Sequence, residues 1–496
     1  MNFIDFFYET VNYNLDDFSD KWNRAISESE ELRIALEVMG KIAKLFPDKD
    51  IFIVGGVPRD LLMGNIIDDV DMATNIPIDE LKKNFELRNI SKNDSQPVYA
   101  LIYGGYSFDL AKFREDSQSE AGRQNNIAVE VDSFEVDSAR RDITINSFGI
   151  DHTGRIVDYQ GGLDDLKNKI IRAVGNAKER FKEDATRILR VFRFAAKMDF
   201  NLDPDTEKAA VELKSLLSDP SMISQESISK EFYKVAKSGV SLANFLIKLQ
   251  NTNILHDILP EFTAMEGMMH NPKYHPEGGS TVLGHILECL RVSPYKDPVI
   301  NLAVMFHDFG KAVTRGEKGG QSTYYGHEAA GVPIVSEIFK RLKFNELSAS
   351  DKESILNAVK NHMLIHQLDN LNVKTLSKLI LDPNWEVLKA TGYCDEASRG
   401  TPLFNADEFW AKIQRAEAKV QNLGGDKDEL RLKIKQYIDG NKLLLWYPEL
   451  SKNRAIIKDV MQVAQDYILD ELDKGRTPTE DNIKDVLEKQ FNLTDK

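Results

Sequence analysis

Apolar residues recur at helical spacing from Glu31 to Phe46, which predicts an amphipathic helix. The apolar run Ile51–Val54 follows and ends at Gly55-Gly56, a pattern typical of a buried strand that leads into a tight turn. A short helix over Pro58–Leu62 is expected next. Further strands are predicted over Val70–Ala73, Val98–Tyr103, Ser107–Phe113 and Ile127–Val131. The first third of the chain is therefore predicted to be α/β.

From Glu179 onward the apolar pattern is almost continuously helical. The segment Phe262–Gly279, rich in Asn, Pro, His and glycine pairs, is the best candidate linker. We therefore expect an N-terminal extension over 1–30, an α/β head over 31–150, a helical neck over 151–270, a second helical domain over 271–400 and a helical tail over 401–496.

Length and composition are those of a globular protein of several domains. The chain has 496 residues, of which 42% are apolar and 29% charged, and this excludes collagen-like and wholly disordered classes. Sixty-four basic against 79 acidic residues give 64 − 79 = −15. Contact with nucleic acid would therefore need a local basic strip, and the segment Lys178–Lys197 is the candidate.

The cysteine content and the apolar runs of the sequence predict the cellular compartment of the protein. Only two cysteines occur, Cys289 and Cys394, which favours a reducing compartment. Residues 1–20 carry acids where a secretion signal would carry positive charge, and no apolar run reaches the ~20 residues that span a bilayer. We expect a cytoplasmic protein without a membrane partner.

Asp69-Val70-Asp71 lies in a stretch predicted to be a strand, where side chains two apart point to one face. Converging carboxylates favour a cation, and oxygen ligands suit Mg²⁺. The alternative is a solvated turn rich in aspartate, because Asp68 adjoins the pair. Upstream, Gly55-Gly56 and Arg59 would let backbone N–H groups and a guanidinium approach a triphosphate.

With these motifs the chain resembles class II nucleotidyltransferases, the bacterial-type CCA-adding enzymes and poly(A) polymerases of the polymerase-β superfamily. Arg140–Asn146 is similar to the RRDxTxN element of ribose recognition, Asp158–Leu166 to the neck entry, and Glu183–Arg187 to the EDxxR templating motif. The resemblance implies a polymerase-β-like head followed by an all-α neck and body. The nucleotide-binding residues it implies are Gly55, Gly56, Arg59, Arg140, Arg141, Asp142, Asn146, Asp184, Arg187, Arg190 and Arg193.

Asp184 and Arg187 are three apart and would be neighbours on one helix face. A carboxylate accepts from an exocyclic amine and a guanidinium donates to ring acceptors, so the pair can read a Watson–Crick edge in place of a template. A helix salt bridge is the alternative reading. Two departures from the family pattern stand out: Ala185-Thr186 inside EDxxR, and Gln225-Glu226, where the family usually carries Glu-Arg.

The chemistry so implied is two-metal nucleotidyl transfer with Asp69 and Asp71 as Mg²⁺ ligands. Asp109 falls where the superfamily often has a third acid. The alternative is that it is only an ordinary polar residue on a strand. The polar stretch Arg114–Asn126 resembles the flexible loop associated with adding the terminal A.

The second helical domain carries an H…HD…D pattern and resembles HD-type metal-dependent phosphohydrolases. The resemblance implies His285, His307, Asp308 and Asp395 as primary ligands and His327 and His362 as ligands of a second ion. Mixed imidazole and carboxylate ligands suit Zn²⁺, Mn²⁺, Fe or Ni²⁺. Retained structural histidines are the alternative, and His275 and His366 are expected to be surface or loop residues.

The function favoured by these motifs is addition of CCA to tRNA from CTP and ATP, with a phosphohydrolase activity of the HD domain on RNA 3′ ends. The alternatives are a poly(A) polymerase, a partial enzyme that adds only C or only A, and an HD phosphohydrolase whose transferase head is inactive. The intact DxD, RRD and EDxxR motifs argue against the last.

Overall fold

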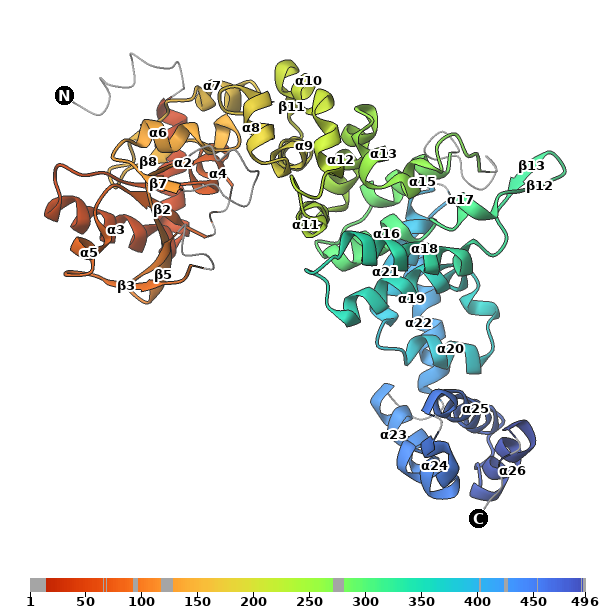
Figure 1. Cartoon of the computed structure of the whole chain (residues 1–496). Helices are drawn as coiled ribbons and strands as arrows, with labels where there is room; N and C mark the ends of the chain where they lie inside the picture. Colours follow the sequence, from red (N-terminus) through yellow and green to blue (C-terminus); the bar gives the residue numbers. More distant parts are fainter. Residues whose placement is uncertain are drawn as a thin grey trace. The chain divides into compact units, whose positions relative to one another are not determined.

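The structure, a computed structural model of the chain, describes residues 15–65, 67, 69–91, 97–116, 128–270, 281–400, 403–422, 427–452, 454–491 and 493 (Figure 1). The chain divides into two compact units. The first comprises residues 1–235, 241–263 and 342–344, and the second 236–240, 264–341 and 345–496. The first unit thus holds the predicted head and most of the predicted neck.

A seven-stranded mixed sheet forms the head, in the order β3-β4-β5-β2-β1-β8-β9. Its strands are β1 (Ile51–Val54), β2 (Asp71–Thr74), β3 (Glu86–Asn89), β4 (Val98–Tyr103), β5 (Tyr106–Lys112), β8 (Gly149–Ile150) and β9 (Ile156–Val157). Strands β2 and β5 are parallel, and the other pairs are antiparallel. The helices of the head are α2 (Leu15–Glu28), α3 (Glu30–Leu45), α4 (Gly56–Met63), α5 (Ile78–Leu81) and α6 (Phe134–Ala139).

The predicted α/β head is confirmed. Strands β1 and β4 have the predicted bounds, while β2 and β5 are displaced by one residue from the prediction. The last predicted strand corresponds to β7 (Ala128–Glu130), which pairs with β6 (Arg114–Asp116) outside the main sheet. Strands β3, β8 and β9 were not predicted, because two to four residues are too few to show an alternating pattern.

Aromatic packing anchors the helix that leads into the RRD element. Phe134, the first residue of α6, packs with ring centroids 4.8 Å from Phe52 of β1 and 5.5 Å from Phe113. These side chains are at most 4% exposed. Helix α6 is therefore fixed to the sheet, and its C-terminal end carries Arg140.

The neck is helical from α7 onward. Its helices are α7 (Gly162–Lys167), α8 (Ala177–Glu183), α9 (Thr186–Met198), α10 (Pro204–Glu212), α11 (Gln225–Val235), α12 (Gly239–Asn251), α13 (Ile254–Ile258) and α14 (Pro260–Thr263). The short strands β10 (Ile170–Ile171) and β11 (Asn201–Leu202) pair in parallel beside them.

The second unit is also predominantly helical. Its elements are α15 (Val282–Arg291), α16 (Pro298–Phe306), α17 (Lys311–Thr314), β12 (Gly316–Lys318), β13 (Gln321–Thr323), α18 (His327–Leu342), α19 (Ala349–Ile365), α20 (Val373–Ile380), α21 (Trp385–Ala397), α22 (Ala406–Gln421), α23 (Lys427–Tyr437), α24 (Gly440–Trp446), α25 (Arg454–Asp473) and α26 (Glu480–Phe491). Within the described residues no helix is long and apolar enough to span a membrane.

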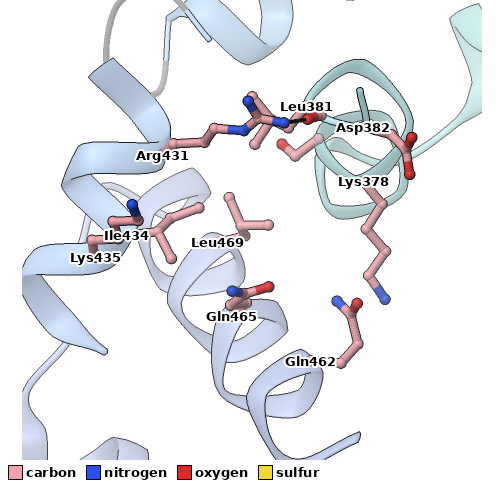
Figure 2. Close-up of a pocket in the computed structure, with 10 residues that line it drawn as sticks. Lys378, Leu381, Asp382, Arg431, Ile434, Lys435, Gln462, Gln465 and Leu469 are labelled. Carbon is pink, nitrogen blue, oxygen red and sulfur yellow. Dashed lines mark hydrogen bonds between the residues drawn. The ribbon is translucent and has the colours of Figure 1, made fainter. Parts of the chain in front are cut away.

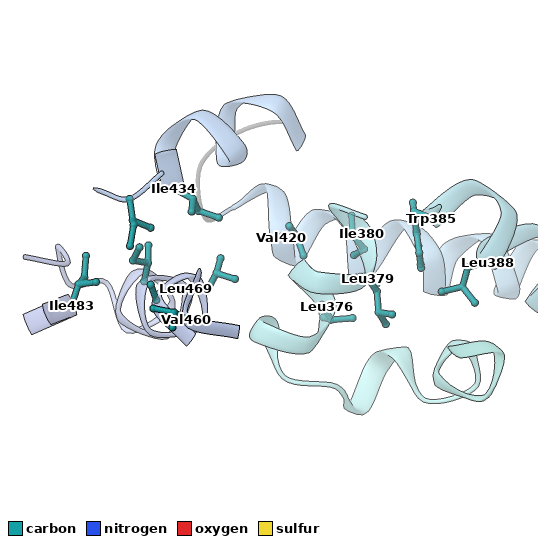
Figure 3. Close-up of a cluster of buried hydrophobic side chains, with 14 of the residues drawn as sticks. Leu376, Leu379, Ile380, Trp385, Leu388, Val420, Ile434, Val460, Leu469 and Ile483 are labelled. Atoms are coloured by element: carbon teal, nitrogen blue, oxygen red, sulfur yellow. The ribbon is translucent and has the colours of Figure 1, made fainter. Parts of the chain in front are cut away.

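One apolar cluster connects the tail helices to the helices before them. Leu376 of α20, Val460 of α25 and Ile483 of α26 are all fully buried in it (Figure 3). Next to this cluster, α20, α23 and α25 line a pocket of about 550 Å³ with both polar and apolar walls. Figure 2 shows Arg431 reaching across the pocket to donate to the Leu381 carbonyl. Residues after Gly400 thus pack as a continuation of the second unit.

Candidate functional sites

Two carboxylates meet on adjacent strands of the head sheet. Asp71 begins β2 and lies in register with Asp109 on the parallel strand β5, so the two side chains leave the same face. Asp69 was predicted to share the strand with Asp71, and this is wrong. It precedes β2 in the left-handed region, at φ 63, a conformation that aspartate tolerates better than most residues. Asp68 lies outside the described residues.

These acids influence one another electrostatically. Burial, together with the charges of Asp69 and Asp109, raises the pKa of Asp71 to about 6. Burial and the charge of Asp69 also raise the pKa of Asp109. A divalent cation would offset this repulsion, so the oxygen donors present fit Mg²⁺.

Gly55 lets the backbone pass close to this acidic group. It has φ 79, and a Cβ at this position would lie 3.2 Å from Asp71 Oδ2. Any larger residue would therefore crowd the carboxylate as well as strain the turn. The glycine turn therefore lies directly beside the acids, and the approach of this turn to a triphosphate stays a prediction.

Arg59 lies inside the head and is 5% exposed. Its guanidinium donates to Asp60 at 2.7 Å and to Asn146 Oδ1 at 2.5 Å. It also lies 5.6 Å from the ring of Phe194 on α9. Arg59 thereby connects α4 to the RRDxTxN segment and to the neck.

Asp137 holds the two arginines of the RRD element. Its Oδ1 accepts from Arg140 at 2.7 and 2.9 Å, and its Oδ2 accepts from Arg141 at 2.9 Å. The Asp137 side chain is fully buried, and although burial alone would raise its pKa, the charges of Arg140 and Arg141 hold that pKa below its usual value. Sequence reasoning missed Asp137, which lies on α6 three residues before Arg140.

The remaining predicted arginines have carboxylate partners too. Arg190 donates to Asp142 at 2.6 and 2.9 Å, and Arg193 donates to Glu231 of α11 and stacks 4.1 Å from the ring of Phe194. Glu231 is 2% exposed and was not predicted. Lys178 and Arg180 pair with Glu212 and Glu183. The predicted basic strip over Lys178–Lys197 therefore carries less uncompensated charge than its sequence suggests.

Asp184 and Arg187 do not share a helix, contrary to the prediction. Helix α8 ends at Glu183, Asp184 is extended with φ −148, and α9 begins at Thr186. The Asp184 side chain accepts from the Thr186 N–H at 2.9 Å. Arg187 donates to Glu183 at 2.7 Å and to the Arg140 carbonyl at 3.0 Å. The helix break, not helical spacing, determines where the two side chains lie.

Arg114–Asp116 forms β6, whereas 117–127, including Ser117, Ser119, Gly122 and Gln124–Asn126, lies outside the described residues.

In the second unit, Asp308 lies between two sets of histidines. Its Oδ2 is 3.3 Å from His307 Nε2 and 3.7 Å from His285 Nε2. Its Oδ1 is 3.2 Å from His327 Nε2 and 3.7 Å from His362 Nε2. Asp395 Oδ1 lies 3.2 Å from His285 Nε2. All six predicted HD residues are therefore brought together in one cluster.

Three of these imidazoles are oriented by the backbone. The Nδ1 atoms of His307, His327 and His362 each lie 2.7 to 2.9 Å from a carbonyl oxygen three residues earlier. Because Nδ1–H donates to that carbonyl, Nε2 presents a lone pair to the centre of the cluster. The Nε2 atoms of His327 and His362 lie 3.1 Å apart, and burial together with the neighbouring imidazole of His307 lowers the pKa of His362 to about 3. This donor set fits one or two transition-metal ions.

Lys311 and His366 extend the cluster beyond the prediction. Lys311 Nζ donates to Asp308 Oδ2 at 2.5 Å. His366 was expected to be a surface or loop residue, and this is wrong, because its Nε2 lies 2.8 Å from Asp395 Oδ2. Although burial opposes a charged ring, Asp395 and Glu396 raise the pKa of His366 to about 9. His275 lies outside the described residues.

Cys289 joins the cluster and was also missed. Donor atoms of His285, Cys289, His307 and Asp395 lie within 4.8 Å of one another, and those of Asp308, His327 and His362 form a second such group. Both cysteines of the chain are free and buried. The spacing of four residues from His285, within one predicted helix, was a signal available in the sequence.

Comparisons with known proteins identify both domains. Residues 51–172 match the Poly A polymerase head domain family, and residues 274–396 match the HD domain family. A CCA-adding enzyme of Lactobacillus helveticus is 36% identical over 220 residues, which are 44% of this chain and 54% of that protein. A CCA-adding enzyme of Streptococcus pneumoniae is 39% identical over 205 residues, which are 41% of this chain and 50% of that protein. The chain thus spans about half the length of these curated relatives.

Solved structures share the fold over most of the chain. A Bacillus stearothermophilus CCA-adding enzyme in complex with CTP has a TM-score of 0.60 at 21% identity, covering 94% of this chain and 98% of that one. A Thermotoga maritima CCA-adding enzyme complexed with tRNA has a TM-score of 0.51 at 17% identity, covering 95% and 98%. The predicted architecture, an α/β head followed by helical domains, is confirmed.

Proposed function

We propose that this chain, which joins a Poly A polymerase head domain to an HD domain, is a CCA-adding tRNA nucleotidyltransferase that uses CTP and ATP. The observation that carries the proposal is the meeting of Asp71 and Asp109 on adjacent parallel strands, with Gly55 against Asp71. The curated relatives, which are CCA-adding enzymes, support the same activity, and the related structures solved with CTP and with tRNA support the substrates.

In the proposed reaction the 3′-hydroxyl of tRNA attacks the α-phosphorus of the nucleotide, and pyrophosphate leaves. Asp69 and Asp71 would hold Mg²⁺, and the bound ion would provide Lewis acidity for this in-line displacement. Asp109 completes the acidic face. Arg140 and Arg141, oriented by Asp137, hold the nucleotide, with Arg190 and Arg193 as further contacts from α9.

Base selection is assigned to Asp184 and Arg187. The Asp184 carboxylate accepts from the exocyclic amine that cytosine and adenine share, and Arg187 donates to the ring acceptors. The Arg187 guanidinium donates to Glu183 and to the Arg140 carbonyl. These two hydrogen bonds hold it beside the RRD element. We place this activity in the cytoplasm, where two free, buried thiols are stable.

Primer extension tests the proposal. Three tRNA transcripts that lack CCA, CA or only A are incubated with the purified chain, Mg²⁺ and CTP or ATP, separately and together. Addition that stops after CCA and is lost in Asp71→Ala supports it. Unlimited A addition would identify a poly(A) polymerase, and addition of only C or only A a partial enzyme. Absence of any incorporation would contradict the transferase assignment.

A second function, metal-dependent hydrolysis of phosphate esters, is proposed for the HD domain. The observation that favours it is the Asp308 carboxylate, whose two oxygens face different histidine sets. The proposed substrates are 2′,3′-cyclic phosphates and phosphomonoesters at RNA 3′ ends. Hydrolysis of a 2′,3′-cyclic nucleotide is measured with Mn²⁺, Ni²⁺, Zn²⁺ or Fe²⁺. Activity that is lost in Asp308→Ala and kept in Asp71→Ala supports the proposal, and inactivity with every ion would refute it.

A further inference from the structure

The backbone N–H of Val70 lies between Asp69 and Asp71 and precedes the hydrogen-bonded ladder of the sheet. Strand β2 begins only at Asp71, which pairs with Val54 of β1 and with Asp109 of β5. Val70 itself is 2% exposed. A buried backbone donor in such a place costs free energy unless an acceptor reaches it.

Glu31 supplies this acceptor from a segment 39 residues away in the sequence. Its Oε1 accepts from the Val70 N–H at 3.3 Å. Glu31 is half-buried and belongs to the first turn of α3. The contact therefore ties helix α3 to the turn that carries Asp69.

Helix α3 is itself held firmly on the head. Ser29 caps its first turn by accepting from the Leu32 N–H at 3.2 Å, and Leu32 is fully buried. Ile34 packs so closely on the turn between β4 and β5 that a Cβ at Gly104 would lie 2.8 Å from its Cγ2. The Glu31 carboxylate therefore projects from a backbone that has little freedom to move.

The turn before β2 needs such support. Asp69 lies in the left-handed region at φ 63, and a residue other than glycine persists there only when the surrounding structure holds it. The charges of Asp69, Asp71 and Asp109 also repel one another when no cation is bound. Both effects favour movement of Asp69 away from Asp71, and a fixed Val70 N–H opposes that movement.

We propose that Glu31 is a positioning residue of the head, which keeps Asp69 beside Asp71 by accepting from the Val70 N–H, so that both carboxylates are presented to one Mg²⁺ ion. Glu31 acts through the backbone of the turn and is not itself a metal ligand. The inference rests on the nucleotidyl transfer proposed for the head. It gives a part in that reaction to helix α3, which precedes the matched head domain at residues 51–172.

The first turn of α3 offers matched variants. Glu31→Ala removes the acceptor, whereas Glu31→Gln keeps an oxygen that can accept from the same N–H. Glu30→Ala is the control, because Glu30 is an acid of the same turn whose described contacts are with Arg33 at 3.3 Å and Tyr106 at 3.4 Å. Loss of an acid from the helix N-terminus is therefore common to both alanine variants.

Hydrogen–deuterium exchange resolved to the Val70 amide tests the contact without any activity. It is measured on the full chain in the presence of a chelator. The amide should exchange slowly in the unsubstituted protein and in Glu30→Ala, at least about tenfold faster in Glu31→Ala, and at an intermediate rate in Glu31→Gln. Fast exchange in the unsubstituted protein would overturn the proposal, and this measurement does not depend on the folding of any variant.

The Mg²⁺ dependence of primer extension tests the positioning role. We expect Glu31→Ala to need about tenfold more Mg²⁺ for half-maximal incorporation, with an unchanged KM for tRNA, and we expect Glu31→Gln to recover most of this loss. Faster amide exchange with an unchanged Mg²⁺ requirement would overturn the positioning role and leave Glu31 as a structural contact. Absence of incorporation by the unsubstituted protein would overturn the proposed transferase and, with it, the role of Glu31, whatever the amide exchange shows.

Discussion

Asp71 and Asp109 lie in register on the parallel strands β2 and β5, and each carboxylate has a raised pKa. This arrangement is unfavourable for the protein alone. A folded-state pKa of about 6 for Asp71 means that its negative charge costs stability at neutral pH. An acidic pair of this kind is expected where a cation completes the site.

The first prediction concerns stability without metal. Because the pKa of Asp71 rises from 3.8 to about 6 on folding, the folded state binds the proton more tightly than the unfolded chain does. The loss of folding stability caused by the Asp71 charge is absent below pH 3.8 and complete above about pH 6. In the presence of a chelator at pH 7.5, Asp71→Asn should raise the free energy of unfolding by about 1–2 kcal/mol, after allowance for solvent screening.

Thermal unfolding between pH 4 and pH 8 checks this prediction. The stabilisation by Asp71→Asn should shrink toward zero as the pH falls to 4, and excess Mg²⁺ at pH 7.5 should reverse its sign because only the unsubstituted protein gains the ion. Asp205→Asn, at an exposed position of α10, is the control. An effect independent of pH would contradict the raised pKa.

Asp137 provides the second prediction. Replacing it with Asn leaves Arg140 and Arg141 without their buried anion, so stability should fall by about 3 kcal/mol. Misplaced guanidinium groups should also lower kcat/KM for CTP and ATP, by about 10- to 100-fold. The matched control is Asp151→Asn, which removes a partner of the more exposed Arg155. A loss of stability with unchanged kcat/KM at a temperature where the variant is folded would show that Asp137 does not position the nucleotide contacts.

Sequence patterns predict the head well because its central strands show as apolar runs or as alternating apolar and polar positions. The run Ile51–Val54 and the following glycines specify β1 and its turn without long-range information. Asp109 was singled out by the family resemblance, which places a third acid at this strand position. In contrast, the position of Asp69 depends on its own left-handed backbone conformation. The alternation of apolar and polar residues along a strand does not reveal such a conformation.

Most of the site residues that the sequence did not reveal are partners contributed by distant segments of the chain. Glu231 meets Arg193 across 38 residues, and His366 meets Asp395 across 29. Neither contact leaves a local periodic signal, since it arises only when the helices pack. The residues of the HD cluster were predicted as a set because their H…HD…D pattern resembles a known family. The i,i+4 pair His285 and Cys289 was available in the sequence but was not used.

The third prediction concerns nucleotide choice. An aspartate at 184 accepts from the amines of cytosine and adenine and repels the carbonyls of uracil and guanine. Asp184→Asn supplies a donor as well, so the incorporation of UTP and GTP relative to CTP and ATP should rise about tenfold. Single-turnover incorporation of each nucleotide on a transcript that ends before CCA measures this ratio, with Asp205→Asn as the control. An unchanged ratio would argue that Asp184 serves only as the acceptor for the Thr186 N–H.

The fourth prediction concerns metal binding through His366. Its Nε2 lies 2.8 Å from Asp395 Oδ2, leaving Oδ1, which is 3.2 Å from His285 Nε2, for an ion. Loss of such an outer partner typically costs 10- to 100-fold in metal affinity because the ligating carboxylate is no longer oriented. His366→Ala should therefore weaken Co²⁺ or Zn²⁺ binding to this extent, as measured by competition with a chromophoric chelator, and His366→Gln, which restores a donor, should recover part of it. His256→Ala at an exposed position is the control, and tRNA extension by the head should be unaffected. Equal metal affinity in His366→Ala and in the unsubstituted protein would mean that Asp395 is oriented by its helix alone, without help from His366.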